Sequence, residues 1–558
     1  MLSKKKETFG KLVIFAIAMG LCLTAIQIGA MSTTIPKPEF KNCKTRNIFN
    51  LKRATFTNEL TNSYRTSTNL KTLTSGTDIP IITSGEYDIQ KPSIATNGNE
   101  ILVIAEENQS MFASDVIITY SSDGGDTWAN PIGFTGMEDT MKNKPCVDYT
   151  GVNDFQAYGS CMADPSTGEL PIFHFPSMTD PEAIWEESEG WTVVTLGFAG
   201  EYEDFTGIDV CGYPHGEEIA PTPDFHGMVV FTCIDVSTGL ETFAFVYETE
   251  DSSSSIVYME DVEGEVSDIS SDIDLSTGEF YEALEWKNAN EEYNLDDGVF
   301  MDHNNLEPGN DDWWEDTWTE FTFEGAHNPD VAADGGNCYL VYEMVNPTFG
   351  FTDIYCAHSN DNGETFQIDR VTQTDLEEEH YPSATAIGQT VICSYNRNGN
   401  LYTSTSEDGG ITWEESEHIN DINGCVAEQP YCADISGGRY ITWTMDAEGT
   451  SNIYFDTLEL DISILEIESI AGGFGVSAAV KNVGTALATD VQWSIDLDGS
   501  VFIGAEKEGT ISSLAVGSSE TVKTGFVFGL GKATIKVTVG GATKTAEGTV
   551  IGPFVIVT

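Results

Sequence analysis

Residues 359–366 read Ser-Asn-Asp-Asn-Gly-Glu-Thr-Phe, and this stretch decides the fold because its pattern occurs three times in the 558 residues of the chain. Ser-x-Asp-x-Gly-x-Thr, followed by Trp or Phe, returns at residues 121–128 and 406–413. The aspartate can accept hydrogen bonds from its own turn, the glycine tolerates a positive φ, and the aromatic ring can pack between sheets. Each copy therefore predicts a turn that closes a β-hairpin. The pattern positions are Ser121, Asp123, Gly125, Thr127, Trp128, Ser359, Asp361, Gly363, Thr365, Phe366, Ser406, Asp408, Gly410, Thr412 and Trp413.

This motif resembles the Asp box, or bacterial neuraminidase repeat, of sialidase-like β-propellers. The resemblance implies an all-β fold in which the boxes are structural and lie on the propeller rim, away from the face that binds ligands. It implies less about activity, because one fold supports many functions.

Short apolar strands recur through the same region, and several of them begin at a proline. Their starts lie at residues 91–94, 144–147, 207–210, 266–269, 328–331, 381–384 and 429–432. A spacing of roughly 50 to 60 residues fits a four-stranded blade with its loops. The sequence therefore predicts about seven blades, with six or eight as alternatives.

The tail of the chain has a different pattern. From about Ile464 it contains long alternating strands and no cysteine, which favours an immunoglobulin-like β-sandwich. Val480-Lys481-Asn482-Val483-Gly484 followed by Trp493 resembles the adhesion-related sandwich modules of exported microbial proteins. We expect a leader at 1–30, an N-terminal segment, partly loop, at 31–85, the propeller at 86–460 and the sandwich at 461–558.

The N-terminus predicts export. Four lysines precede an apolar run from Leu12 to Ala30, and Ile28-Gly29-Ala30 fits a cleavage site for a signal peptide. The run is also near the length that spans a bilayer, so an uncleaved N-terminal anchor is the alternative. We expect a secreted or cell-surface protein that meets a membrane only through such an anchor.

The chain is strongly acidic, with a formal net charge of −65. From Ile464 onward there are nine acidic and six basic residues, so the propeller carries nearly all of this charge. Such a field repels nucleic acid and anionic membranes. A solvated acidic surface is the plain interpretation, and calcium binding is the alternative, at 296–298, at 311–316 or at 421–424. None of these clusters matches the spacing of an EF-hand loop, so we predict no defined metal site.

Ten cysteines remain once the leader, with Cys22, is removed, and an even number in an exported protein favours disulfides. Three pairs fall on neighbouring predicted strands, and a fourth pair would close a short loop. The expected pairs are Cys146 with Cys161, Cys211 with Cys233, Cys338 with Cys356, and Cys425 with Cys432, which leaves Cys43 and Cys393 to join each other.

Sialidase chemistry conflicts with the arginine content. The resemblance would require three arginines that grip the substrate carboxylate, the first of them at the start of the first blade, where this chain has Lys91. A lysine cannot supply the planar, bidentate fork of arginine. We expect only Arg397 to reach the central funnel. The catalytic candidates are therefore Arg397 with Asp209, Glu428 and Tyr381, although a turn-capping carboxylate is the plainer explanation of Asp209.

Binding is the alternative to catalysis. Lys91, His327 and His380 begin inner strands, while Trp313 and Trp314 lie in a long acidic loop where indole rings could stack on sugars. We predict a surface module that binds an extracellular glycan or a surface protein, with no organic cofactor. A glycoside hydrolase with two funnel carboxylates is the runner-up, so the enzyme question stays open. The negative field favours a neutral glycan.

Overall fold

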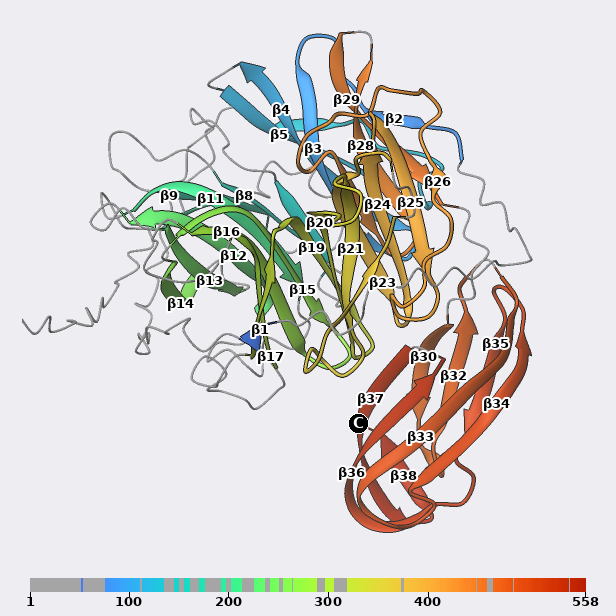
Figure 1. The fold of residues 1–558 in the computed structure, drawn as a ribbon. Coiled ribbons are helices and arrows are strands. Elements are labelled where there is room, and N and C mark those ends of the chain that lie inside the picture. The colour runs from blue at the N-terminus through green and yellow to red at the C-terminus, as the bar shows by residue number, and fades with distance from the viewer. Residues whose placement is uncertain are drawn as a thin grey trace, which may run out of the picture.

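A computed structural model describes the chain in the following segments: 52–53, 76–110, 113–134, 145–149, 155–160, 170–175, 192–196, 202–212, 225–235, 241–249, 254–262, 264–288, 297–305, 319–372, 376–447, 449–458, 465–484, 486–540 and 542–557. All the regular secondary structure in these segments is β-strand (Figure 1). No helix long and apolar enough to cross a membrane occurs in them. The leader, Trp313, Trp314, Cys43, Cys161 and residues 311–316 lie outside the described segments.

Four-stranded sheets follow one another along the chain from residue 88 to residue 457. The first three are β3 (Asp88–Asn97), β4 (Glu100–Ser110), β5 (Ala113–Ser121) and β6 (Ile132–Phe134); β7 (Cys146–Tyr149), β8 (Phe155–Ser160), β9 (Leu170–Phe175) and β10 (Thr192–Leu196); and β11 (Tyr202–Gly212), β12 (Phe225–Asp235), β13 (Glu241–Thr249) and β14 (Ser254–Val262). The next three are β15 (Gly264–Asp274), β16 (Glu279–Asn288), β17 (Gly298–Asn305) and β18 (Thr319–Glu324), with β1 (Lys52–Arg53) parallel to β18; β19 (Ala326–Asp334), β20 (Asn337–Val345), β21 (Thr352–Ser359) and β22 (Gln367–Arg370); and β23 (His380–Ile387), β24 (Thr390–Arg397), β25 (Asn400–Ser406) and β26 (Glu417–His418).

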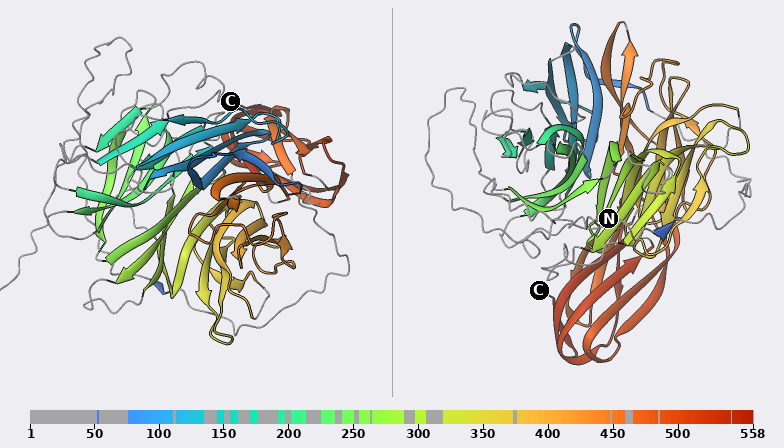
Figure 2. Two further views of the ribbon diagram at one scale, coloured as in Figure 1. Left: turned by 90° about the horizontal axis from the view of Figure 1, so that it is seen from above. Right: turned by 60° about the vertical axis from the view of Figure 1, so that its left-hand side comes forward.

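The seventh sheet joins the two ends of the propeller. It contains β27 (Ala433–Ser436), β28 (Tyr440–Ala447) and β29 (Thr450–Thr457), and its outermost strand is β2 (Ile79–Ile82), from the N-terminal side. The first strands β3, β7, β11, β15, β19, β23 and β27 contact one another in that order, and β27 contacts β3. The sheets therefore close into a ring, the all-β propeller that the sequence predicts (Figure 2). Six of the expected strand starts fall on the first strand of a sheet, and the seventh lies just before β27.

Sheet-on-sheet packing explains the apolar strands. Seven consecutive residues of β20, from Asn337 to Glu343, are buried, because neighbouring sheets cover both faces of this strand. Tyr339 and Val341 pack with Tyr395 of the following sheet, whereas Leu340 packs with Phe323 of the preceding one. A near-continuous apolar run is thus the sequence signature of a second strand here.

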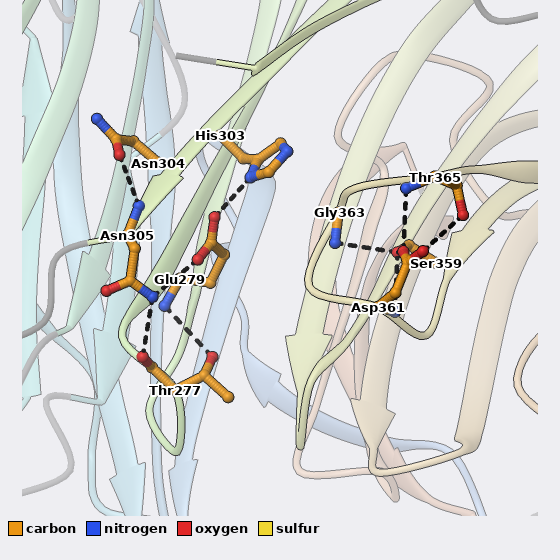
Figure 3. A network of polar contacts seen from close by, with 9 residues as sticks. All are labelled: Thr277, Glu279, His303, Asn304, Asn305, Ser359, Asp361, Gly363 and Thr365. Atoms are coloured by element: carbon orange, nitrogen blue, oxygen red, sulfur yellow. Dashed lines mark hydrogen bonds and ion pairs between the residues drawn. The ribbon is translucent and has the colours of Figure 1, made fainter. Parts of the chain in front are cut away.

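Each of the three repeats that resemble an Asp box forms the hydrogen-bonded turn that its residues predict. Asp361 accepts the backbone N–H of Thr365 at 3.0 Å and its hydroxyl at 2.7 Å, and Gly363 N–H donates to Ser359 Oγ at 3.0 Å (Figure 3). Equivalent bonds form around Asp123 and Asp408. Phe366 then packs edge-on against Phe321 of the preceding sheet, with ring centroids 4.9 Å apart. The box therefore ties its own hairpin to the neighbouring sheet.

The C-terminal residues form a second body, drawn below the propeller in Figure 1. One sheet contains β30 (Leu465–Ala471), β32 (Ser477–Asn482) and β35 (Ser519–Lys523). The other has the order β31 (Gly473–Phe474), β38 (Phe554–Val557), β37 (Ala542–Gly552), β36 (Phe528–Val539), β33 (Ala488–Ile503) and β34 (Glu506–Leu514). Ile467 and Val480 of the first sheet share one core with Ile495 and Ile535 of the second, as in a β-sandwich. The immunoglobulin-like assignment stays a prediction.

The disulfide predictions fail where both cysteines are described. Cys338 and Cys356 are free thiols: Cys356 lies opposite Val341, three residues from Cys338, so the two side chains leave opposite faces of the sheet. Cys211 is also free and lies opposite Met228, five residues along β12 from Cys233, too far for a bridge. Cys425, Cys432 and Cys393 are free as well. The pairs Cys146–Cys161 and Cys43–Cys393 each include a cysteine outside the described segments.

Candidate functional site

The backbone is strained at one repeated position in the inner strands. Lys91, Asn328 and Tyr381 each precede a proline and have φ values of 52°, 46° and 56°. A positive φ is uncommon for a residue with a side chain, and such strain persists only where surrounding contacts fix it. At each of these positions the pairing of the first strand with the second is also shifted. Strained positions of this kind concentrate at functional sites, which directs attention to this end of the sheets.

The strained positions and the Asp boxes lie at opposite ends of the sheets. In the fifth sheet, His327 near the start of β19 is opposite Glu343 of β20, whereas Ser359 of the box is opposite Cys338 at the other end of β20. The first sheet has the same arrangement, because Gln90 pairs with Glu106 and Ser121 pairs with Ile101. We call the end at which the first strands begin the entry face. Among described residues it includes Lys91, His327, Asn328, His380, Tyr381 and Tyr431.

Buried glutamates from second strands hold the cationic groups of the entry face. Glu106, which is 6% exposed, lies 3.0 Å from the ammonium of Lys91. Glu343, which is 5% exposed, is 2.5 Å from Nδ1 of His380, whose side chain is 39% exposed. The hydrogen bond to Glu343 raises the pKa of His380, although partial burial acts in the opposite direction. The imidazole is thereby oriented with one edge toward solvent.

The third pair is Glu285 with His327, and like Glu343 with His380 it joins two neighbouring sheets. Glu285 on β16 accepts a hydrogen bond from the backbone N–H of Asn328 at 2.9 Å and lies 3.3 Å from Nδ1 of His327 on β19. Burial alone would raise the pKa of Glu285, but the bonds from His327, Asn328 and Ser267 lower it to about 2. The bond to Glu285 likewise raises the pKa of His327. His327 and His380 therefore belong to adjacent sheets, and each is supported by a glutamate of the sheet before it.

Tyrosines line the mouth of the axial channel. Tyr431, at φ 61°, donates a hydrogen bond from its hydroxyl to Asp268, which lies on β15 across the ring. Tyr381 stands beside His380, with ring centroids 5.6 Å apart. Tyr381 and Tyr431, together with Asn328 and Asp434, border a cavity of about 30 Å³. That space holds roughly two water molecules. A sugar ring would therefore lie across this mouth rather than inside it.

Below the mouth, inner-strand aspartates join successive sheets. Each is half-buried and accepts a backbone N–H from the first strand of another sheet. Gly212, Ser271, Ala333, Ala384 and Ile94 donate to Asp148, Asp209, Asp272, Asp330 and Asp434, at 2.7, 2.7, 2.7, 2.7 and 2.9 Å. Burial raises the pKa of Asp148 to about 7 and raises the pKa of Asp272 as well. The catalytic candidate Asp209 thus lies within β11 and has a bonding role between sheets.

We expected Arg397 to reach the central funnel, but its side chain is enclosed by other residues. It is 7% exposed at the end of β24, and its Nε donates to Glu379 at 3.0 Å. Its guanidinium also stacks 4.4 Å from the ring centre of Tyr402. Because these contacts enclose the guanidinium, it cannot clamp a substrate carboxylate in the axial channel. Glu428, the other carboxylate candidate, is exposed before β27.

Residues 421–424 are one of the clusters at which calcium binding was the alternative interpretation. There the carboxylate of Asp421 accepts the backbone N–H of Asp78 at 3.3 Å, and the carboxylate of Asp78 accepts the backbone N–H of Asp421 at 2.8 Å. Within the described segments, no group of three or more acidic, histidine or cysteine side chains is arranged to hold a metal ion.

The sequence analysis missed Glu106, Glu285 and Glu343. Each ends an apolar run in a second strand, namely 101–105, 283–284 and 338–342. A glutamate directly after the apolar run of a second strand occurs in three of the repeats, and this recurrence could have identified them as candidate site residues. Their partners became visible only with the strand register.

Comparison with known proteins adds structural likeness only. No family model matches the chain, and no curated protein matches it. A polysaccharide lyase described as an ulvan lyase matches with 10% identity and a TM-score of 0.41, and the match covers 68% of this chain and 96% of the lyase chain. A sialidase from Trypanosoma rangeli matches with 10% identity and a TM-score of 0.36, covering 86% and 90%. A fucose-specific lectin from Aleuria aurantia matches with 8% identity and a TM-score of 0.33, covering 62% and 99%. Such likenesses carry no argument about activity.

Proposed function

We propose that the entry face of the propeller binds a neutral carbohydrate outside the cell. The observation that carries the proposal is the pair of half-exposed histidines, His327 and His380, each fixed by a buried glutamate of the adjacent sheet. Tyr381 lies beside His380 and adds an aromatic surface. Imidazole groups held in fixed orientations suit the hydroxyl groups of sugars, and a neighbouring aromatic ring suits their apolar faces.

Charge supports a neutral ligand. The chain has a net charge of −65, and Lys91, His327 and His380 each have a carboxylate within 3.3 Å. An anionic sugar would meet a repelling field and local cations that are already neutralised. The small axial cavity supports surface binding, in which several sugar units lie across the mouth.

A glycoside hydrolase is the second candidate, and the pairing of the entry-face glutamates disfavours it. Hydrolysis needs two carboxylates that converge on one glycosidic bond, one of them protonated. Glu106, Glu285 and Glu343 instead bind Lys91, His327 and His380, and the bonds around Glu285 favour its ionised form. Export and surface location, inferred from the leader, are part of the proposal and place the ligand among extracellular glycans.

A glycan array tests the proposal directly. We expect the full chain to bind neutral glycans, and His380→Gln and Tyr381→Asn to raise Kd at least tenfold. Glutamine keeps a donor for Glu343, and asparagine tolerates the positive φ, so both variants should fold. His418→Gln on the outermost strand β26 is the matched control and should bind normally.

Two results would count against the proposal. Equal binding by wild type and His380→Gln would place the ligand elsewhere. Turnover of a chromogenic glycoside panel by the wild type, lost in His380→Gln, would show a hydrolase instead of a binding module.

A further inference from the structure

We propose that the far end of the C-terminal sandwich is a self-association surface, through which two copies of the chain form a dimer. The surface, which we call the apolar tip, consists of Phe474, Phe526, Phe528, Leu530, Ile551 and Phe554. Their exposed fractions are 62, 51, 43, 69, 51 and 56%. Six large apolar side chains exposed to this degree at one place are unusual on a protein that stays monomeric.

Strand register makes the tip continuous. Phe474 on β31 is directly opposite Phe554 on β38, Phe554 is opposite Ile551 on β37, and Ile551 is opposite Leu530 on β36. These four side chains therefore share one face of the sheet and form a row across four neighbouring strands. Phe526 extends the row, because its ring centroid lies 5.7 Å from that of Phe474 and 6.5 Å from that of Phe528.

The tip lies at the end of the sandwich that is remote from the propeller. β30 starts at Leu465, close in sequence to the last propeller strand, and ends at Ala471, so the 472–475 turn occupies the far end (Figure 1). The turn at Pro553 meets it there, where Gly475 N–H donates to the carbonyl of Pro553. The inward-facing Val555 and Val550 belong to the sandwich core, so the exposed row is additional to the side chains that the core requires.

The exposed area matches what a dimer needs. Aromatic side chains offer roughly 150–250 Å² each, and leucine and isoleucine offer areas near the lower end of that range. With Ile503 and Ile556 at its margins, which are 56% and 53% exposed, the tip presents on the order of 800 Å². A standard interface buries about 800 Å² from each partner. A two-fold arrangement, in which the same patch meets itself, would cover the tip and close the assembly at two chains.

Charge favours a second copy at this place over any other contact between copies. The propeller carries nearly all of the net −65, whereas the tail has nine acidic and six basic residues. Association through the tips keeps the two propellers at opposite ends of the dimer, where their repulsion is weakest. The contact is therefore the least costly one for a pair of such acidic chains, and added salt should strengthen it.

Sedimentation velocity of the full chain over a concentration series tests the proposal. We expect a concentration-dependent dimer at 0.15 M NaCl, a tighter dimer at 1 M NaCl, and a Kd at least tenfold weaker in Leu530→Lys. Leu487→Lys is the matched control, because Leu487 is 55% exposed beside the opposite end of β33 and should leave the dimer intact. All variants keep the same N-terminal apolar run, so its contribution cancels in the comparison.

Cross-linking gives a second readout. Phe474→Cys should form a disulfide-linked dimer on mild oxidation, whereas Leu487→Cys should not. A monomer at every concentration, or a dimer unchanged by Leu530→Lys, would overturn the proposal. So would flotation of a monomeric wild type with phosphatidylcholine vesicles, abolished by Leu530→Lys, because the tip would then face a bilayer.

Discussion

Gly363 shows why the Asp box needs glycine at its fifth position. Its φ is 78°, and a Cβ atom built on it would lie 2.8 Å from Cε1 of Tyr281 and 2.9 Å from Nε2 of His303. His303 cannot easily yield, because its Nδ1 is 2.5 Å from the carboxylate of Glu279 (Figure 3). The box glycine is thus a contact point between sheets as well as a turn residue.

We predict that Gly363→Ala lowers the free energy of unfolding of the propeller by about 2–4 kcal/mol, from backbone strain plus the clash. Gly350→Ala is the matched control, because Gly350 has a φ of 77° with nothing within 4 Å of its added Cβ. That variant should lose only about 1 kcal/mol. Urea unfolding followed by tryptophan fluorescence measures both. Equal losses in the two variants would exclude a role for the contact with Tyr281 and His303.

The residues of the candidate site were only partly predictable. His327, His380 and Lys91 could be found from the sequence because they precede or begin inner strands, and Tyr381 for the same reason. Their pairing with glutamates could not, because Glu285 is 42 residues from His327 and Glu343 is 37 residues from His380. Arg397 was misplaced because the sequence suggests a loop there and does not show that Glu379 and Tyr402 enclose its guanidinium.

At the scale of strands, the sequence predicted the positions of the sheets well. It predicted the pairing of the cysteines poorly. Proline marks the first strands, whose pairing with the second strands is shifted there, and apolar runs mark second strands such as β20, which neighbouring sheets cover on both faces. A cross-strand disulfide depends instead on register to the single residue. The three-residue offset between Cys338 and the partner position of Cys356 reverses the face, and no sequence pattern reveals it.

We predict that Cys425 reacts far faster with a maleimide in the native protein than do Cys338, Cys356, Cys393 and Cys432. Those four are buried, and burial raises the pKa of each thiol, to about 12 for Cys432. The thiolate is the reactive form, so both access and ionisation protect them.

Peptide mapping by mass spectrometry reads the labelling of each cysteine separately. After denaturation without reductant, all five should label completely, which also tests that they are free. Resistance of Cys338 and Cys356 to labelling until reductant is added would restore the disulfide that the register excludes.

At the scale of the whole molecule, buried carboxylates set the dependence of stability on pH. Burial raises the pKa of Asp148 to about 7, of Glu417 to about 7 and of Asp456 to about 6, so the folded state holds protons that the unfolded state has released. The stability that these groups contribute is complete below about pH 4 and is lost progressively as the pH rises from about 4 through the folded-state pKa values of 6 to 7. Glu285, with a pKa of about 2, acts in the opposite sense and loses its contribution below about pH 4.5.

We therefore predict the highest Tm near pH 4.5, with a fall as the pH rises toward 7. Asp148→Asn should make that fall shallower, because the amide oxygen can still accept the N–H of Gly212 but the group cannot ionise. Differential scanning calorimetry across pH 4 to 8 measures the profile. A Tm that rises from pH 5 to pH 8 would contradict the predicted protonation of these buried carboxylates.

The seventh sheet has a consequence for how the protein is made. Ser84, just after β2, donates its N–H to Asn452 on β29, 368 residues later in the chain. At roughly 5–20 residues per second, synthesis takes on the order of 20–70 s to deliver the second half of this closure after the first has emerged. During that interval β2 has no strand to pair with, and the edge of the first sheets stays open to other nascent chains. A factor that covers exposed strands, or transfer of the growing chain through a narrow passage that keeps it extended, would therefore matter more for the yield of this protein than for a fold closed by neighbouring strands.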